Sequence, residues 1–199
     1  MRSTAISLED AFARFDALIF ESSDRLRVAS ICGFAAITSL TVGRWSESER
    51  YANLAAATDP ESQFGFFRGL ELLHRGILLA WRGEVDDALP LFAAGKARYL
   101  ELDAHSGLPM YDASLAIQTA RHGRVDVSRV HAADARAELT ARRELWTLTS
   151  VLLGEAAVAE ASGDIPAART LREQASTVAA EQGAFALAEL ARADRAPAT

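Results

Sequence analysis

The chain has 199 residues, 50% of them hydrophobic, so a single domain can bury a sizeable core and disorder is disfavoured. A formal net charge of -6 disfavours direct DNA or RNA binding, because nucleic-acid affinity comes largely from basic groups. Cys32 is the only cysteine, the N-terminus lacks the apolar stretch of a signal peptide, and the uncharged segment 28–43 is too short to cross a membrane. We therefore expect a cytoplasmic protein without membrane contact.

Ten helices and no strands are predicted along the chain. Apolar residues recur at helical spacing, as in Leu70, Leu73 and Ile77, and no alternating apolar and polar run of useful length occurs. Pro90 falls inside one of these helices, and it is tolerated in the first turn if Asp86 is the N-cap. The predicted helices cover residues 7–21, 25–42, 45–58, 63–81, 85–102, 108–122, 125–141, 144–162, 165–182 and 184–194.

Four glycines divide the chain at intervals of 40 residues. They are Gly43, Gly83, Gly123 and Gly163. A glycine can end a helix in the left-handed conformation, after which Ser46, Asp86 or Asp126 can cap the next helix. Each glycine therefore predicts a tight turn between two antiparallel helices, and the period indicates an internal repeat.

Small residues obey the same 40-residue period at three further positions. Helices approach each other closely only where the side chains at the crossing are small, so these positions are predicted helix contacts. The three sets are Ala36, Gly76, Ala116 and Ala156; Ser48, Ala88, Ser128 and Ala168; and Ala55, Gly95, Ala135 and Ala175.

This pattern resembles the tetratricopeptide repeat, which places small residues at matching offsets around its inter-helix turn. The match runs from about Leu26 to Gln182, with Phe92 at an aromatic position and Pro60 closing a repeat, although the family's usual period is 34 residues. The segment 76–89 is similar to the repeat tails of large actinobacterial ATP-binding regulators of the LuxR type and of cyclase-linked ATPases.

The resemblance implies an all-α fold, with the whole chain, 1–199, as a single domain. The expected architecture is an α-solenoid of about four TPR-like helical hairpins with a capping helix at each end. The implied repeats are about 25–62, 63–105, 106–142 and 143–182, and the implied caps are 7–21 and 184–194.

The resemblance also implies a concave groove, lined by the first helix of each hairpin, in which a partner binds. Some family members grip a peptide carboxylate with a Lys/Asn/Arg clamp, which has no counterpart here. The groove is therefore expected to be apolar, unless strong curvature or a terminal helix closes it into ordinary core, and both alternatives stay open. The candidate partner-binding or ligand-binding residues are Phe34, Ile37, Leu70, His74, Ile77, Trp81, Met110, Tyr111, Ser114, Ile117, Arg121, Trp146 and Ser150.

Catalytic and metal-binding motifs are not found in the sequence. Glu71 and His74 form one Glu-x-x-His pair, but a di-iron site needs a second copy, so a local helix pair is predicted instead. His131 and Asp134 share a helix face and are predicted to form a surface pair, and Cys32 is predicted to be a buried structural cysteine. We expect no metal, no cofactor and no catalytic residue.

Three functions from different classes remain open. The favoured hypothesis is a non-enzymatic scaffold or regulatory module that binds a protein or peptide, including a second copy of itself as a homodimer. The second is a small-molecule sensor with an apolar pocket near Trp81, Tyr111 and Trp146. The third is an enzyme that uses His74, Glu71 or Arg121.

Overall fold

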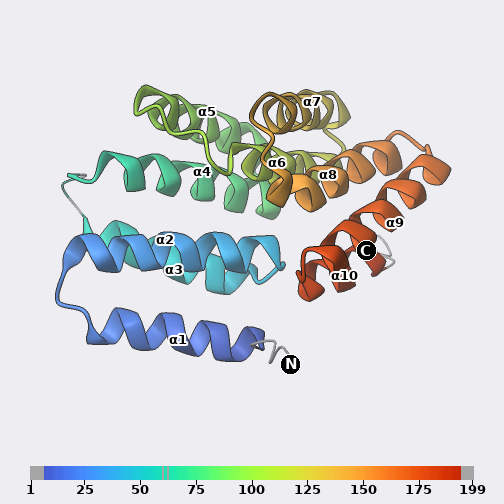
Figure 1. Cartoon of the computed structure of the whole chain (residues 1–199). Helices are drawn as coiled ribbons and strands as arrows, with labels where there is room; N and C mark the ends of the chain where they lie inside the picture. The colour runs from blue at the N-terminus through green and yellow to red at the C-terminus, as the bar shows by residue number, and fades with distance from the viewer. Residues whose placement is uncertain (1–6, 60, 62, 194–199) are drawn as a thin grey trace.

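The computed structural model describes residues 7–59, 61 and 63–193. Regular structure in these ranges is entirely helical and they contain no strand, which confirms the all-α prediction. The helices run back and forth along a curved path, with α1 at one end and α10 at the other (Figure 1). They are α1 (Leu8–Glu21), α2 (Arg25–Thr41), α3 (Trp45–Thr58), α4 (Gly65–Arg82), α5 (Val85–Glu101), α6 (Leu108–Arg121), α7 (Val125–Arg142), η1 (Leu145–Thr147), α8 (Leu148–Ala161), α9 (Ile165–Glu181) and α10 (Phe185–Arg192).

The observed helices begin and end within two residues of the predicted bounds, except at the start of α8. There the chain forms the 3-10 turn η1 before the α-helix begins. The Leu145 carbonyl accepts hydrogen bonds from the Leu148 amide, three residues further on, and from Gln182 Nε2 at 2.8 Å. The contact with Gln182 is tertiary and 37 residues away, so the local sequence does not reveal it.

The turns at the four periodic glycines have the same geometry. Their φ angles are 76°, 90°, 74° and 83°, all in the left-handed region that favours glycine. At Gly83 the glycine amide donates to the Ala80 carbonyl, and the next amide, of Glu84, donates to the Leu79 carbonyl at 3.0 Å. The same two bonds recur at the other three turns, and also at Gly183 between α9 and α10. Each turn therefore satisfies the carbonyls at a helix end in the same way.

The predicted caps of three helices are wrong. α3, α5 and α7 begin only two residues after the glycine, so Ser46, Asp86 and Asp126 lie inside the first turn and not at the N-cap. No side chain caps these helices, whereas Asp164 does accept a bond from the Ala167 amide in α9. Pro90 consequently lies in the second turn of α5, where the Asp86 carbonyl lacks its helical donor. Both residues are exposed, so water can satisfy this carbonyl.

The periodic small residues lie where the two helices of each pair touch. All twelve are buried except Ala55, which is half-buried. Ser48 Oγ donates to the Ala36 carbonyl at 2.9 Å, and Ser128 Oγ makes the equivalent bond to Ala116 at 2.7 Å. In the pair α4 and α5, a Cβ atom added to Gly95 would lie 2.7 Å from the backbone nitrogen of Leu73. Backbones therefore meet directly, and only glycine fits at that crossing.

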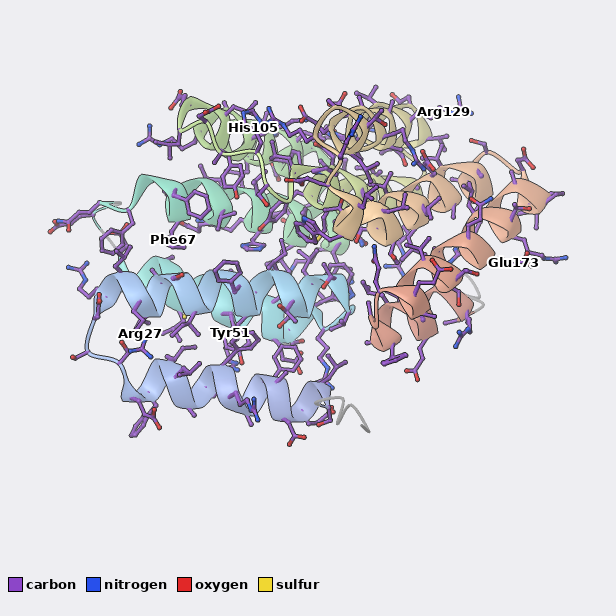
Figure 2. All side chains as sticks on the ribbon, viewed as in Figure 1. Arg27, Tyr51, Phe67, His105, Arg129 and Glu173 are labelled. Carbon is purple, nitrogen blue, oxygen red and sulfur yellow. The ribbon has the colours of Figure 1, made fainter. Side chains whose placement is uncertain are left out.

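The core follows the helix pairs, and its largest cluster joins α4, α5 and α6. Phe92 is 1% exposed within it. At the N-terminal end, Phe12 and Phe15 of α1 pack against Tyr51 of α3 (Figure 2). Pro60 lies outside the described residues. Among the described helices, none combines the length and apolar character that a membrane span requires.

Candidate functional site

The middle of the predicted groove belongs to the protein interior. Ile77 is fully buried, and Leu70, Met110 and Tyr111 pack with it in one core cluster between α4 and α6. His74 and Ser114 are buried as well. These six side chains therefore present almost no surface to a partner.

The other predicted groove residues are accessible to different degrees. Ile37, Trp81, Ile117 and Ser150 are half-buried, and Trp81 stacks on Trp45 with ring centroids 5.4 Å apart. Phe34 on α2 and Trp146 in η1 are 64% and 53% exposed, and Arg121 at the end of α6 is also exposed. The exposed members thus lie on α2, α6 and η1, whereas every predicted member on α4 is buried or half-buried.

His74 and Tyr111 are hydrogen-bonded to each other inside the core. The Tyr111 hydroxyl lies 3.3 Å from His74 Nε2, and burial lowers the pKa of His74 to about 4 while it raises the pKa of Tyr111 well above its usual value. Both groups are therefore neutral near pH 7. Glu71 instead bonds Arg68 and Arg75, so the local Glu71–His74 pair expected from the sequence does not form among the described contacts.

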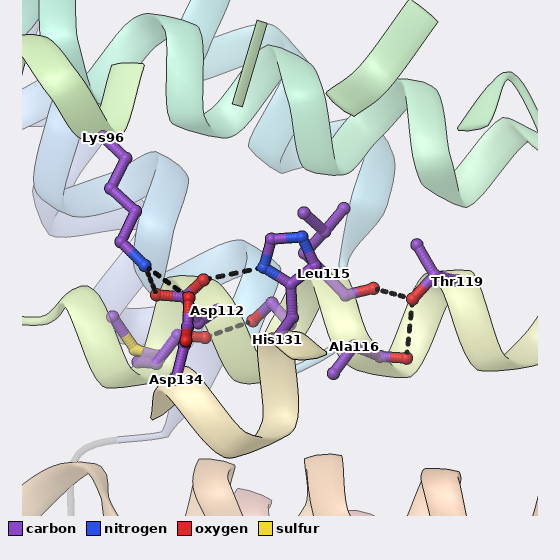
Figure 3. Close-up of polar contacts among 9 residues, drawn as sticks. Lys96, Asp112, Leu115, Ala116, Thr119, His131 and Asp134 are labelled. Carbon is purple, nitrogen blue, oxygen red and sulfur yellow. Dashed lines mark hydrogen bonds and ion pairs between the residues drawn. The ribbon is translucent and has the colours of Figure 1, made fainter. Parts of the chain in front are cut away.

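A charged network that is not predicted from the sequence joins α5, α6 and α7 (Figure 3). Asp112 is completely buried and accepts bonds at 2.8 Å from both Lys96 Nζ and His131 Nδ1. Lys96 also bonds Asp134 at 3.1 Å, so His131 and Asp134 meet through shared partners and not as the predicted surface pair. Asp112 is the only charged residue between Leu108 and Ala120. An isolated carboxylate in an apolar helix requires a buried partner, and that was the available signal.

This network is suited to holding helices together. Oxygen and nitrogen atoms of Asp112, His131 and Asp134 lie within 4.8 Å of one another, which is a donor set for a divalent cation. However, the Lys96 ammonium already lies between the two carboxylates. Burial acts to lower the pKa of Lys96, but attraction to Asp112 and Asp134 outweighs burial and raises it. Lys96 is thus a built-in positive charge that balances the buried carboxylate.

An accessible groove of about 490 Å³ lies at the C-terminal end, between α9, the end of α8 and α10. Its apolar and small residues include Ile165, Ala168 and Ala191, and Glu173 also lines it (Figure 2). Three arginines surround the groove: Arg169, Arg172 and Arg192. Arg172 bonds Glu160, and burial together with the neighbouring Arg172 lowers the pKa of Arg121 nearby. Glu160 and Glu173 also line the groove, so three arginines and two glutamates give it a small net positive charge in a protein of negative net charge.

The preceding helix pair indicates what covers this kind of surface. Forty residues earlier, on α7, Arg136 bonds Glu155 of α8 through Nε at 2.7 Å, and Arg129 bonds Ser162 at the end of α8. The part of α8 that carries these contacts has no counterpart in α10, which ends at Arg192. Among the described residues, the surface of α9 that corresponds to this part of α7 is therefore open.

Neither a protein-family model, a curated protein nor a solved structure matches the chain. Its function has to follow from the surfaces described above. The His74–Tyr111 pair and the Lys96 network bond mainly within the protein, whereas the groove beside α9 combines open volume with concentrated charge. This groove is the candidate functional site.

Proposed function

We propose that the protein is a non-enzymatic helical-repeat module that holds a protein or peptide partner. In this proposal the chain is an α-solenoid of about four TPR-like hairpins, with α1 and α10 as its capping helices. The matching bonds and φ angles at the four periodic glycines support this architecture. The burial of the small residues at the helix crossings supports it as well.

The observation that carries the binding role is the arginine-rich groove beside α9. Arginine is enriched in protein interfaces, where its planar guanidinium pairs with carboxylates and its stem packs on apolar surface. The groove offers Arg169, Arg172 and Arg192 around the small residues Ala168 and Ala191. This combination suits an acidic helix better than a partner bound in the apolar groove expected from the sequence, because the apolar positions of α4 and α6 are core.

The internal titratable groups support a non-enzymatic role. His74 is 1% exposed and bonded to Tyr111, while Asp112 is fully buried between Lys96 and His131. A general acid or base must reach its substrate, and these groups face the protein interior. A ligand pocket beside Tyr111 would also require the core to open, because Tyr111 is 2% exposed.

A cytoplasmic location is part of this proposal. Cys32 is fully buried, and burial raises the pKa of its thiol to about 11, so it is held as an unreactive thiol. A single protected thiol suits a reducing compartment.

Capture of partners by the purified, tagged full-length chain tests the binding role. Arg169→Ala/Arg192→Ala should reduce recovery of any specific partner by about tenfold, since hydrogen-bonded charges at an interface contribute on the order of 1.5–3 kcal/mol. The matched control Arg27→Ala/Arg142→Ala removes two exposed arginines elsewhere and should leave recovery unchanged. Equal recovery by all three proteins, or no specific partner for the parent protein, would contradict the proposal.

A further inference from the structure

The outer face of α1 is uncovered by the described residues. α1 packs against the rest of the protein through Phe12, Phe15 and Ile19, and the opposite face is exposed. This outer face carries Asp10, Ala13, Arg14, Ala17 and Glu21, with Phe20, which is 92% exposed, beside it. Two alanines four residues apart allow another helix to approach closely.

Helix α1 is also the charge complement of the groove. It contains four carboxylates, on Glu9, Asp10, Asp16 and Glu21, against the single arginine Arg14. Glu9 and Asp16 are paired with Arg44 and Arg50, but Asp10 and Glu21 make no ion pair among the described residues. The open face therefore carries two acidic groups, one near each end of the helix, with the exposed Arg14 between them, and its net charge is negative.

The dimensions of the two surfaces agree. α1 has 14 residues and is about 21 Å long at 1.5 Å per residue. The residues of α9 that line the groove run from Ile165 to Thr177, which is about 20 Å of helix by the same rise. The Arg136–Glu155 contact between α7 and α8 shows, within this chain, a carboxylate of a crossing helix bound by an arginine of the helix beneath it.

We propose that the groove beside α9 binds helix α1 of a second copy of the chain. This inference rests on the proposed binding role and names the partner as the protein itself. The contact joins two different surfaces, so it is a head-to-tail interface that produces either a closed ring or an open chain of copies. Phe20 of the incoming helix adds an aromatic side chain to an interface otherwise built from alanines and ion pairs.

Charge reversal tests the contact because the two surfaces can be altered separately. One variant reverses the groove, Arg169→Glu/Arg192→Glu, and the other reverses the helix, Asp10→Arg/Glu21→Arg. The parent protein should sediment as concentration-dependent oligomers, and each variant alone should associate at least about tenfold more weakly. An equimolar mixture of the two variants should recover the association, because each reversed surface then meets its complement. Circular dichroism and melting temperature check that both variants fold like the parent.

Three outcomes would overturn the inference: a parent protein that stays monomeric at all concentrations, association that neither reversal weakens, or a mixture that does not recover. Crosslinks from a photoreactive residue introduced at position 169 to residues 194–199 of the same copy would also overturn it, because they would show that the chain covers its own groove. A monomeric protein that captures another partner through Arg169 and Arg192 defeats this inference alone and leaves the proposed function standing.

Discussion

Single polar side chains in the interior mark the places where helices of different pairs are bound to one another. His74 connects α4 to α6 through Tyr111, and Asp112 connects α6 to α5 and α7 through Lys96 and His131. Removing one partner would leave a buried polar group without a hydrogen bond, which costs about 1–3 kcal/mol and more for a charge. These residues therefore determine which helices meet as well as how strongly they pack.

The His74 side chain makes stability depend on pH. Its pKa is lowered from 6.5 to about 4, so between these values the unfolded chain binds a proton that the folded protein does not. The resulting loss of unfolding free energy appears as the pH falls through this window, and it amounts to about 2 kcal/mol between roughly pH 7 and pH 5.

The variant His74→Gln keeps hydrogen-bonding capacity at this position but does not titrate. Urea unfolding at about pH 7 and pH 5 gives the unfolding free energy of the parent and of the variant. The difference between the two proteins should shift by about 2 kcal/mol in favour of the glutamine variant as the pH falls to about 5. A difference that is the same at both pH values would show that His74 is not buried as a neutral side chain.

Residue identities could be predicted from the sequence better than residue partners. His74 and His131 can be singled out from the sequence, but their partners cannot. Tyr111 lies 37 residues from His74, and Asp112 lies 19 residues from His131. Such pairings depend on how separate helix pairs pack, and neither spacing corresponds to a helical or strand period. The groove arginines were missed for the same reason, since Arg169 and Arg192 lie on different helices.

The protein uses glycine in two different ways. The turn glycines are required for their left-handed φ angle, and Gly123 has nothing within 4 Å of an added Cβ atom. Gly95 has ordinary helical geometry but lies against the backbone of α4, where a Cβ atom would be 2.7 Å from Leu73 N and 2.9 Å from Gly69 O. Gly123 allows the chain to turn between two helices, and Gly95 allows two helices to pack closely.

Replacement by alanine should separate these two roles. Gly95→Ala should destabilise the protein by about 2 kcal/mol, because backbone atoms cannot yield, even though alanine favours a helix by about 1 kcal/mol. Gly123→Ala should cost about 1 kcal/mol, from backbone strain alone. Gly123→Asn should recover part of this loss, whereas Gly95→Asn should be worse than alanine, and chemical denaturation measures all four. A Gly95→Ala protein as stable as the parent would contradict the close contact of α4 and α5.

Helix bounds could be predicted because they depend on local signals, namely apolar spacing and the turn glycines. The caps of α3, α5 and α7 could not be placed as well, since the tight glycine turn brings the next helix in earlier than Asp86 or Asp126 suggested. The position of Pro90 follows from the same shift.

At the scale of the whole molecule, packing is strongest in the middle of the array. α4 and α6 are covered from several sides and contribute most of the largest core cluster. α1 and α10 each have an exposed face, with Phe20 and Phe185 more than half exposed. The middle of the groove that the repeat resemblance implies is core in the structure, because the way in which helix pairs pack on one another cannot be read from the sequence of any one pair.

Amide hydrogen exchange should follow this gradient. Exchange should be slowest in α4 and α6 and faster by about tenfold or more in α1 and α10, because end helices can open without breaking the central core. Mass spectrometry of exchanged peptides reports each helix separately. Equal protection in α1 and α6 would contradict a stability that rises towards the middle, unless self-association protects α1, in which case the helix-reversed variant removes that protection.

The Lys96 network has one further consequence for the molecule as a whole. Lys96 is the only lysine in the chain, and its ammonium is held between Asp112 and Asp134. Acylating reagents, and enzymes that attach acetyl groups or ubiquitin to lysine, therefore meet a single side chain whose amine is hydrogen-bonded and protonated. Reagents directed at lysine should therefore label this side chain poorly in the folded protein, and attachment through carboxylates or an introduced cysteine is the better route.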